Sequence, residues 1–117
     1  LGHALTNSKI SYPQAAALVQ FYSRLGPEHW DQLEAGLQKM VDLEPDQPES
    51  HYDLASIQVV RGKTKEALEQ LRIALDLNAK RLKADPTARD LAATNRVDPR
   101  FDALRSSPEF QKITAPK

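Results

Sequence analysis

Histidines and carboxylates are the residues of this sequence that could act in catalysis or hold a metal ion. The three histidines, His3, His29 and His51, fall on separate predicted elements. The close pairs Glu28-His29 and His51-x-Asp53 lack the ligand number and the spacing that a zinc site requires. The sequence also contains no Ser-His-Asp arrangement and no glycine-rich phosphate loop. We therefore predict a protein without enzyme activity, bound metal or cofactor.

Acidic residues gather between the two halves of the helical pattern, at Glu44, Asp46 and Glu49. They could supply a carboxylate pair for acid–base chemistry. A solvated loop that also caps the following helix explains them better. We interpret this cluster as a connection and not as a site.

Basic residues concentrate in the second half of the chain. The densest cluster is Lys80, Arg81 and Lys83, and further arginines follow at positions 89, 96, 100 and 105. Binding of nucleic acid would need such charges on one face, with stacking aromatic rings between them. The aromatic residues of this half, Phe101 and Phe110, are better assigned to a C-terminal segment that caps the fold. We interpret the cluster as a solvent-facing helix end and expect no nucleic acid partner.

The composition is that of an ordinary globular domain. With 117 residues, 40% of them hydrophobic and 27% charged, the chain can bury one modest core. Cysteine is absent, which excludes disulfides and thiol chemistry. No apolar run approaches the roughly 20 residues of a membrane-spanning helix, so we predict a soluble domain without membrane insertion. The absence of disulfides leaves the compartment undecided, and we favour the cytoplasm only slightly over the periplasm. The sequence starts without Met and without a leader-like segment, so we expect a domain of a longer protein.

The net charge of the chain is zero, but the charges are unevenly distributed. Residues 1–58 carry a formal charge of −5 and residues 59–117 one of +5. A chain divided in this way can associate with itself head to tail, or present oppositely charged ends to different partners. Solvated helix faces that happen to differ in charge are the simpler interpretation.

Helix-forming segments separated by prolines organise the chain. β-branched residues are dense only in the segment 56–60, and the residues before it fit a helix equally well. The dipeptides Asp85-Pro86, Asp98-Pro99 and Ser107-Pro108 place an N-cap acceptor before a proline at the first helical position. We therefore predict an all-α fold of roughly five or six helices with short connections.

Residues 48–78 are predicted to form a helical hairpin. Leu68, Leu71 and Leu75 recur at steps of three and four residues, and form one apolar stripe on the segment 64–78. Leu54 belongs to the apolar pattern of the segment before it. Gly62 lies between the two segments, where glycine tolerates the left-handed conformation that a helix exit often needs.

The hairpin pattern occurs twice in the chain. Leu18, Val19, Tyr22 and Gly26 align with Leu54, Ala55, Gln58 and Gly62 at a spacing of 36 residues. Residues of the second helices, such as Leu37 and Leu71, align at a spacing of 34 residues. The difference fits an insertion around Pro27-Glu28. A period in this range indicates an α-solenoid.

The second hairpin resembles a tetratricopeptide repeat. Its matching positions are Leu54, Ala55, Gly62, Ala67, Leu71, Ala74 and Leu77, with Ala55 in place of the family's usual glycine. It departs at His51, Gln58 and Ala79, where the family commonly has Trp, Tyr and Pro. Because that proline is missing, the second helix can run on to the break at Asp85-Pro86. The first hairpin matches less closely, and keeps Leu18, Tyr22, Gly26 and the ending Leu43-Glu44-Pro45.

The segment 98–113 resembles one that often closes bacterial arrays of this family. Phe101, Leu104, Phe110 and Ile113 are spaced as two short amphipathic turns, which could cover the apolar face that the last hairpin leaves open. Solenoid ends need such a cap to stay soluble. Residues 1–6, with Ala4-Leu5, could be the end of a preceding repeat or a frayed end.

The resemblance therefore implies a single domain, residues 1–117, built as an all-α, α-α superhelix. Its repeats would span residues 12–45 and 48–79, with the last helix extended to about residue 84. Residues 85–117 would form the C-terminal helical cap.

The resemblance also implies a concave groove lined by the first helix of each hairpin. The positions that would contact a partner are Gln20 and Arg24 in the first repeat and Tyr52, Ser56 and Val59 in the second. Tyr52 offers an amphipathic ring that costs little entropy to fix, and Arg24 could bind a carboxylate or a carbonyl oxygen. Chaperone-binding relatives hold a C-terminal carboxylate with a Lys/Asn pattern, which is absent here, since Ala16, Gln20, Tyr52 and Ser56 occupy its places.

From these features we predict a non-catalytic protein–protein interaction module whose partner is a protein or a peptide. The alternative is a domain for self-association, for example as a homodimer, or for packing within a larger protein that could be an enzyme. Two repeats fall below the number usually needed for stability, which fits either a missing neighbour or a dimer.

Overall fold

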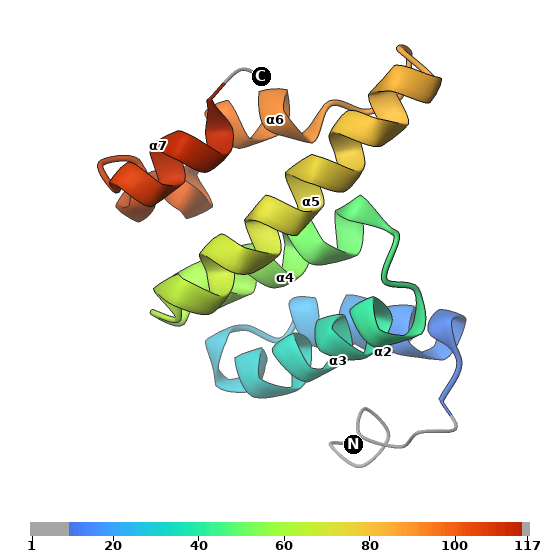
Figure 1. Ribbon diagram of the computed structural model, residues 1–117. Coiled ribbons are helices and arrows are strands. Elements are labelled where there is room, and N and C mark those ends of the chain that lie inside the picture. Colours follow the sequence, from blue (N-terminus) through green and yellow to red (C-terminus); the bar gives the residue numbers. More distant parts are fainter. Residues whose placement is uncertain (1–9, 116–117) are drawn as a thin grey trace. The chain divides into compact units, whose positions relative to one another are not determined.

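The chain is helical throughout the range that can be described. The computed structural model describes residues 10–115, and within this range it contains six α-helices, two 3₁₀-helices and no strand (Figure 1). The predicted all-α fold is confirmed. The chain divides into two compact units, Leu1–Asp46 (unit 1) and Gln47–Lys117 (unit 2), where we predicted a single domain. The tetratricopeptide-like superhelix stays a prediction, and the segment 1–6, with Ala4-Leu5, lies outside the described residues.

Unit 1 is a helical hairpin. Its helices are α2, Tyr12–Ser23, and α3, Trp30–Leu43, joined through the short 3₁₀-helix η1, Pro27–His29. Ser11 begins α2 with a capping box: its hydroxyl accepts from the Gln14 backbone, and the Gln14 side chain accepts from the Ser11 backbone. Gly26 precedes η1 with a φ of 93°, in the left-handed region that glycine adopts at little cost. The predicted insertion around Pro27-Glu28 is therefore the turn η1.

The two helices of unit 1 pack against one another. Ala15 and Tyr22 are buried on α2, and Leu37 and Val41 are buried on α3. The buried residues of each helix are spaced four or seven apart, so each pair falls on one helical face. This is the arrangement that the apolar pattern of residues 12–45 predicts.

Unit 2 begins with a second hairpin, formed by α4, Pro48–Val60, and α5, Thr64–Ala84. Gly62 ends α4 with a φ of 78°, and a Cβ atom added to it would meet nothing within 4 Å. The backbone conformation alone therefore requires glycine here. The Gly62 N–H donates to the Val59 carbonyl at 3.0 Å and the Lys63 N–H to the Gln58 carbonyl at 2.8 Å, which is the hydrogen-bond pattern of a Schellman motif.

Small residues bring α4 and α5 close together. Ala55 of α4 and Ala67 and Ala74 of α5 are all 0% exposed. A larger side chain at any of these positions would force the helix axes apart, because packed interiors have no spare volume. The three alanines are positions that match the tetratricopeptide pattern.

The path of the chain after α5 agrees with one prediction and corrects another. α5 runs to Ala84, as the missing proline at Ala79 predicts. We also predicted a helix start at Asp85-Pro86, and this was wrong: Asp85 accepts from the backbone and the hydroxyl of Thr87, at 3.0 and 2.6 Å, and so forms a local turn. The next helix, α6, Leu91–Arg96, is capped instead by Asp90.

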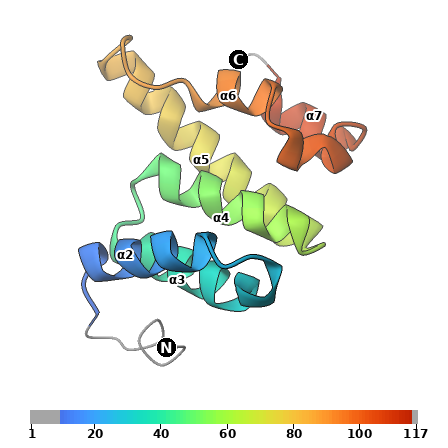
Figure 2. The same cartoon turned by 180° about the vertical axis from the view of Figure 1, so that it is seen from behind.

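The last part of the chain folds back along the α4–α5 hairpin (Figures 1 and 2). It consists of the 3₁₀-helix η2, Pro99–Leu104, and α7, Pro108–Thr114. Asp98 and Ser107 cap these two helices with their side chains, as predicted. The predicted pair of short amphipathic turns is also confirmed, because Phe101, Leu104 and Phe110 are buried and belong to one core cluster with Leu71 and other residues of the hairpin.

Candidate functional site

In unit 2, the residues that we predicted to contact a partner lie on α4. Tyr52 lies in the middle of α4 and is only 2% exposed. Its ring packs on that of Phe101, with centroids 5.3 Å apart. Its hydroxyl donates to Asp98 Oδ2 at 2.7 Å. The ring and the hydroxyl of Tyr52 are therefore both occupied by the segment 98–104 of the same chain.

Asp98 and Arg100 form the charged part of this contact. The Arg100 guanidinium donates to Asp98 Oδ2 from Nη2 at 2.7 Å and to Asp98 Oδ1 from Nε at 3.0 Å. The Arg100 backbone N–H also donates to Asp98 Oδ1, which is the N-cap bond of η2. The guanidinium of Arg100 and, after it, the hydroxyl of Tyr52 lower the pKa of the Asp98 carboxyl to about 2. Asp98 is therefore a carboxylate at any physiological pH.

The same contact changes the acidity of Tyr52. Burial, followed by the bond to the Asp98 carboxylate, raises the pKa of the Tyr52 hydroxyl to about 12. Both effects disfavour a phenolate in this place. Tyr52 is therefore a neutral hydrogen-bond donor here, and a phenol held in this state is not prepared to act as a base.

Ser56 lies one helical turn after Tyr52 and completes the set of α4 contacts. Its hydroxyl accepts from Arg100 Nη1 at 3.0 Å and donates to the Asp53 carbonyl at 2.7 Å. The Arg100 guanidinium also stands 5.9 Å from the centre of the Tyr52 ring. Arg100 is thus bound at once by a carboxylate, a hydroxyl and an aromatic face.

A second set of contacts fixes the chain between α5 and η2. Arg81 donates to both carboxylate oxygens of Glu49, at 2.9 and 2.6 Å, and this ion pair lowers the pKa of Glu49. Asn78, which is 2% exposed, donates to the Arg89 carbonyl at 2.7 Å and accepts from the Leu91 N–H at 2.9 Å. These bonds set the position at which the chain turns back toward α4.

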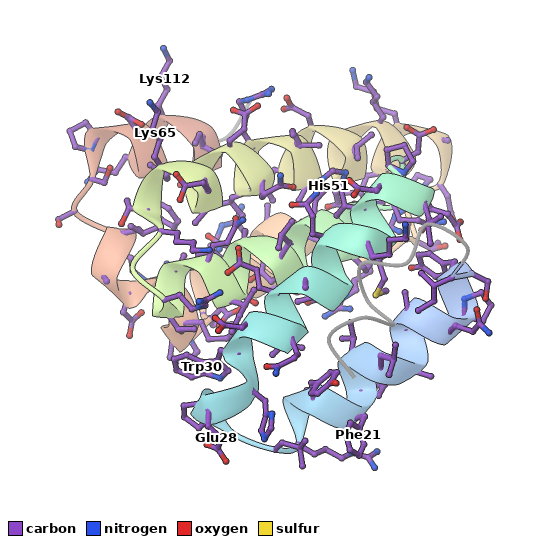
Figure 3. All side chains as sticks on the ribbon, turned by 90° about the horizontal axis from the view of Figure 1, so that it is seen from below. Phe21, Glu28, Trp30, His51, Lys65 and Lys112 are labelled. Carbon is purple, nitrogen blue, oxygen red and sulfur yellow. The ribbon has the colours of Figure 1, made fainter. Side chains whose placement is uncertain are left out.

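The predicted site residues thus fall into two groups. In unit 2, Tyr52 and Ser56 are bound by the segment 98–104, and Val59 is partly buried against the same core cluster. In unit 1, Gln20 is exposed on α2, and Arg24 is exposed at the C-cap of this helix. Between them along α2 lies Phe21, whose ring is 47% exposed and points outward from the helix (Figure 3).

Sequence reasoning missed the partners of Tyr52 and Ser56. We assigned Asp98 to a helix cap, which is correct, and Arg100 to a diffuse group of basic residues. Arg105 was in that group as well, yet it donates to the carbonyls of Asn95 and Asp98, at 3.0 and 2.7 Å. Arg100 and Arg105 therefore act within the fold. The only sequence signal was the order Asp-Pro-Arg, in which the arginine can reach back to the capping carboxylate.

The other described residues that could act in catalysis or metal binding also form no site. His51, which we did not assign to a metal site, is buried, and its Nδ1 lies 2.7 Å from Gln70 Oε1 of α5. Within residues 10–115, no group of three or more His, Asp or Glu residues is placed to hold a metal ion. A groove of about 700 Å³ lies between α5 and α7, with Leu68 and Ile113 among its lining and Lys65 and Lys112 projecting beside it (Figure 3).

Comparisons of the chain with protein-family models, with curated proteins and with solved structures found no match. Among the helices between residues 10 and 115, none has the length and the apolar character needed to cross a membrane.

Proposed function

We propose that this chain is a non-catalytic recognition module that binds a segment of another protein, with two tetratricopeptide-like hairpins as its scaffold. The observation that carries the proposal is the manner in which α4 holds the segment 98–104. Tyr52 and Ser56, both predicted to contact a peptide, bind residues that lie 46 and 44 positions away in the sequence. They contribute one ring and two hydroxyls, which meet a ring, a buried carboxylate and a guanidinium of the segment, and such contacts are the chemistry of peptide recognition.

The exposed face of α2 supports the same proposal for unit 1. Gln20 and Phe21 of α2 are exposed, together with Arg24 and Leu25 directly after its end, and the exposed fractions of Phe21 and Leu25 are 47% and 36%. An exposed ring next to a guanidinium can hold an apolar side chain and a carboxylate of a partner at once. Since the segment 98–104 already binds Tyr52 and Ser56, Gln20 and Arg24 are the predicted contact residues that are exposed to a partner.

The experiment that tests the proposal is affinity capture with the full chain and mass-spectrometric identification of what it retains. The test variant is Arg24→Glu, which reverses one exposed charge on α2. The control variant is Lys80→Glu, which makes the same change at an exposed position of α5. A variant at Tyr52 is unsuited to this purpose because its ring belongs to the core of unit 2.

We expect the unmodified chain and Lys80→Glu to retain the same protein and Arg24→Glu to lose it. The same protein retained equally by all three chains would contradict recognition through α2.

The alternative function is packing, either within a larger protein or between copies of this chain. It is favoured by the same observation, because the face of α4 that we predicted to bind a partner is used for contacts inside unit 2. This alternative predicts that capture retains only the parent protein or further copies of the chain, with no effect of Arg24→Glu.

A further inference from the structure

The segment 98–104 lies on α4 in the way that a bound peptide lies on its receptor. Every third residue of the segment is an anchor: Asp98, Phe101 and Leu104 are 7%, 0% and 5% exposed. The residues between these anchors, such as Pro99 and Asp102, are exposed. A 3₁₀-helix brings residues three apart onto the same face, so η2 presents one face to the hairpin and the other to solvent.

The contacts of this segment with α4 are specific in their chemistry. The Tyr52 hydroxyl donates to a carboxylate, the Ser56 hydroxyl accepts from a guanidinium, and the Tyr52 ring packs on a ring. The carboxylate and the guanidinium come from positions two apart, and the ring follows the guanidinium directly. An apolar segment would leave the buried Tyr52 hydroxyl without its acceptor, which is costly, whereas the Ser56 hydroxyl would keep its bond to the Asp53 carbonyl.

The stretch 85–90 and the short helix α6 connect the segment to the hairpin. Residues 85–90 form a turn and an irregular stretch, in which every residue except Ala88 is exposed, whereas Leu91 and Asn95 of α6 are buried. Asn78 and Arg81 bind this stretch at the Arg89 carbonyl and at Leu91. Because none of the connecting residues belongs to α4 or α5, release of the segment 98–104 together with α6 would not break either helix of the hairpin.

We infer that the Tyr52–Ser56 face of α4 is a receptor for protein segments with a carboxylate, a guanidinium two residues later and an aromatic ring directly after it. Residues 98–101 of the chain are the resident ligand of this receptor, and a partner that carries the same order of groups replaces them. The inference rests on the proposed recognition function and adds to it the chemistry of the partner. It also assigns the C-terminal segment a regulatory role, because the segment keeps the receptor closed until a stronger ligand arrives.

The test uses the full chain and a fluorescent peptide with the sequence of residues 96–113. In the unmodified chain the resident segment competes at an effective concentration on the order of millimolar, so the peptide binds weakly. In the variant Arg100→Ala the resident segment loses its bond to Ser56, and its Asp98 carboxylate loses the guanidinium that pairs with it, whereas Tyr52 and Ser56 remain in place. We expect this variant to bind the peptide at least about tenfold more tightly than the unmodified chain does, as measured by fluorescence anisotropy.

Three controls make the result specific. A peptide with the changes D98N and R100A should bind the Arg100→Ala chain at least about tenfold more weakly than the natural peptide. Adding Ser56→Ala to the Arg100→Ala chain should weaken the natural peptide by a few fold, because one hydrogen bond is lost. Amide hydrogen exchange reports whether residues 98–104 have left α4, and the double variant Arg100→Ala/Phe101→Ala releases them if the single variant does not.

Two results would overturn the inference. One is a segment that stays protected from exchange in both variants, which would make it a permanent part of the core. The other is a released segment with no binding of the peptide, or with equal binding of the natural and the altered peptide. Either result would leave the test of recognition through Arg24 of α2 unaffected, so the failure of this inference and that of the proposed function can be told apart.

Discussion

At the scale of single residues, Asp98 connects local structure to tertiary structure. One of its carboxylate oxygens caps η2 by accepting from the Arg100 N–H, and the other accepts from the Tyr52 hydroxyl of α4. A carboxylate can be nearly buried here because the positively charged guanidinium of Arg100 pairs with it. The stability of unit 2 should therefore depend on the protonation of this one group.

The variant Asp98→Asn should remove an acid-sensitive part of the stability. The pKa of Asp98 is lowered in the fold from 3.8 to about 2, so its contribution is complete above about pH 4 and is lost as the pH falls toward 2. A shift of this size corresponds to about 2 kcal/mol. We expect urea unfolding to show this loss between neutral pH and pH about 2 in the unmodified chain and a smaller loss in Asp98→Asn.

Asn still caps a helix and still accepts a hydrogen bond, so the comparison isolates the charge. An identical pH dependence of the two proteins would show that the Asp98–Arg100 pair does not stabilise the fold.

Tyr52 should respond to alkali in the opposite sense. Its pKa is raised to about 12 by burial and by Asp98, so its contribution to stability is complete below about pH 10 and is lost as the pH rises toward 12. We expect one of the three tyrosines to form its phenolate late in a titration followed by absorbance, and this step to be missing in Tyr52→Phe. In denaturant all tyrosines should titrate near pH 10. A titration of Tyr52→Phe that matches the unmodified chain would contradict the structure.

At the scale of elements, the α4–α5 hairpin and the segment after it are held by different forces. The hairpin depends on local sequence features: alanines allow its two helices to pack closely, and a Schellman motif at Gly62 ends the first of them. The chain after Ala84 is instead placed by side chains of the hairpin, chiefly by Asn78. Asn78 binds the Leu91 N–H, and Leu91 is the first residue of α6. This bond, together with the Asp90 cap, explains why α6 begins at Leu91 and not after Asp85-Pro86.

The variant Asn78→Ala should weaken the attachment of the C-terminal segment. It leaves the buried Leu91 N–H without its partner and the Arg89 carbonyl with only the longer bond from Arg81, which should cost about 2–3 kcal/mol. We expect a lower free energy of unfolding in urea and faster hydrogen exchange of the Leu91 amide. Gln111→Ala, which removes an exposed amide bound to the Arg105 carbonyl, is the matched control and should cost less than about 0.5 kcal/mol. Equal effects of the two variants would contradict a special role for Asn78.

At the scale of the whole molecule, the charges suggest attraction between copies, but only a weak one. Residues 1–46 carry a formal charge of −3 and residues 47–117 one of +3. Exposed ion pairs contribute about 0–1 kcal/mol each and are screened within roughly 8 Å at physiological salt. Several basic residues of unit 2, including Arg81, Arg100 and Arg105, already have partners inside it.

The chain should therefore sediment as a monomer of 13.1 kDa at physiological salt. We expect analytical ultracentrifugation to give a sedimentation coefficient that does not rise with protein concentration. A rise that disappears at high salt would identify head-to-tail association and favour the alternative function. A rise that persists at high salt would indicate association through apolar surface instead.

The sequence by itself determined the elements of this protein, because their signals are local. Apolar periodicity located the helices, Gly26 and Gly62 marked their turns, and Asp98 and Ser107 marked two later starts. Each of these signals acts over three or four residues, within one turn of helix. The same signal misled at Asp85, where the side chain binds Thr87 in a turn that no helix follows.

Only the tertiary structure decided what binds the face of α4 that carries Tyr52 and Ser56. The sequence singled out Tyr52 and Ser56, but their partners are Asp98 and Arg100, which lie 46 and 44 residues away. No local pattern relates residues so far apart, since their meeting depends on where Asn78 turns the chain and on how Phe101 enters the core. The path by which the chain returns to α4 therefore decides whether this surface is free for a partner or is occupied by the same chain.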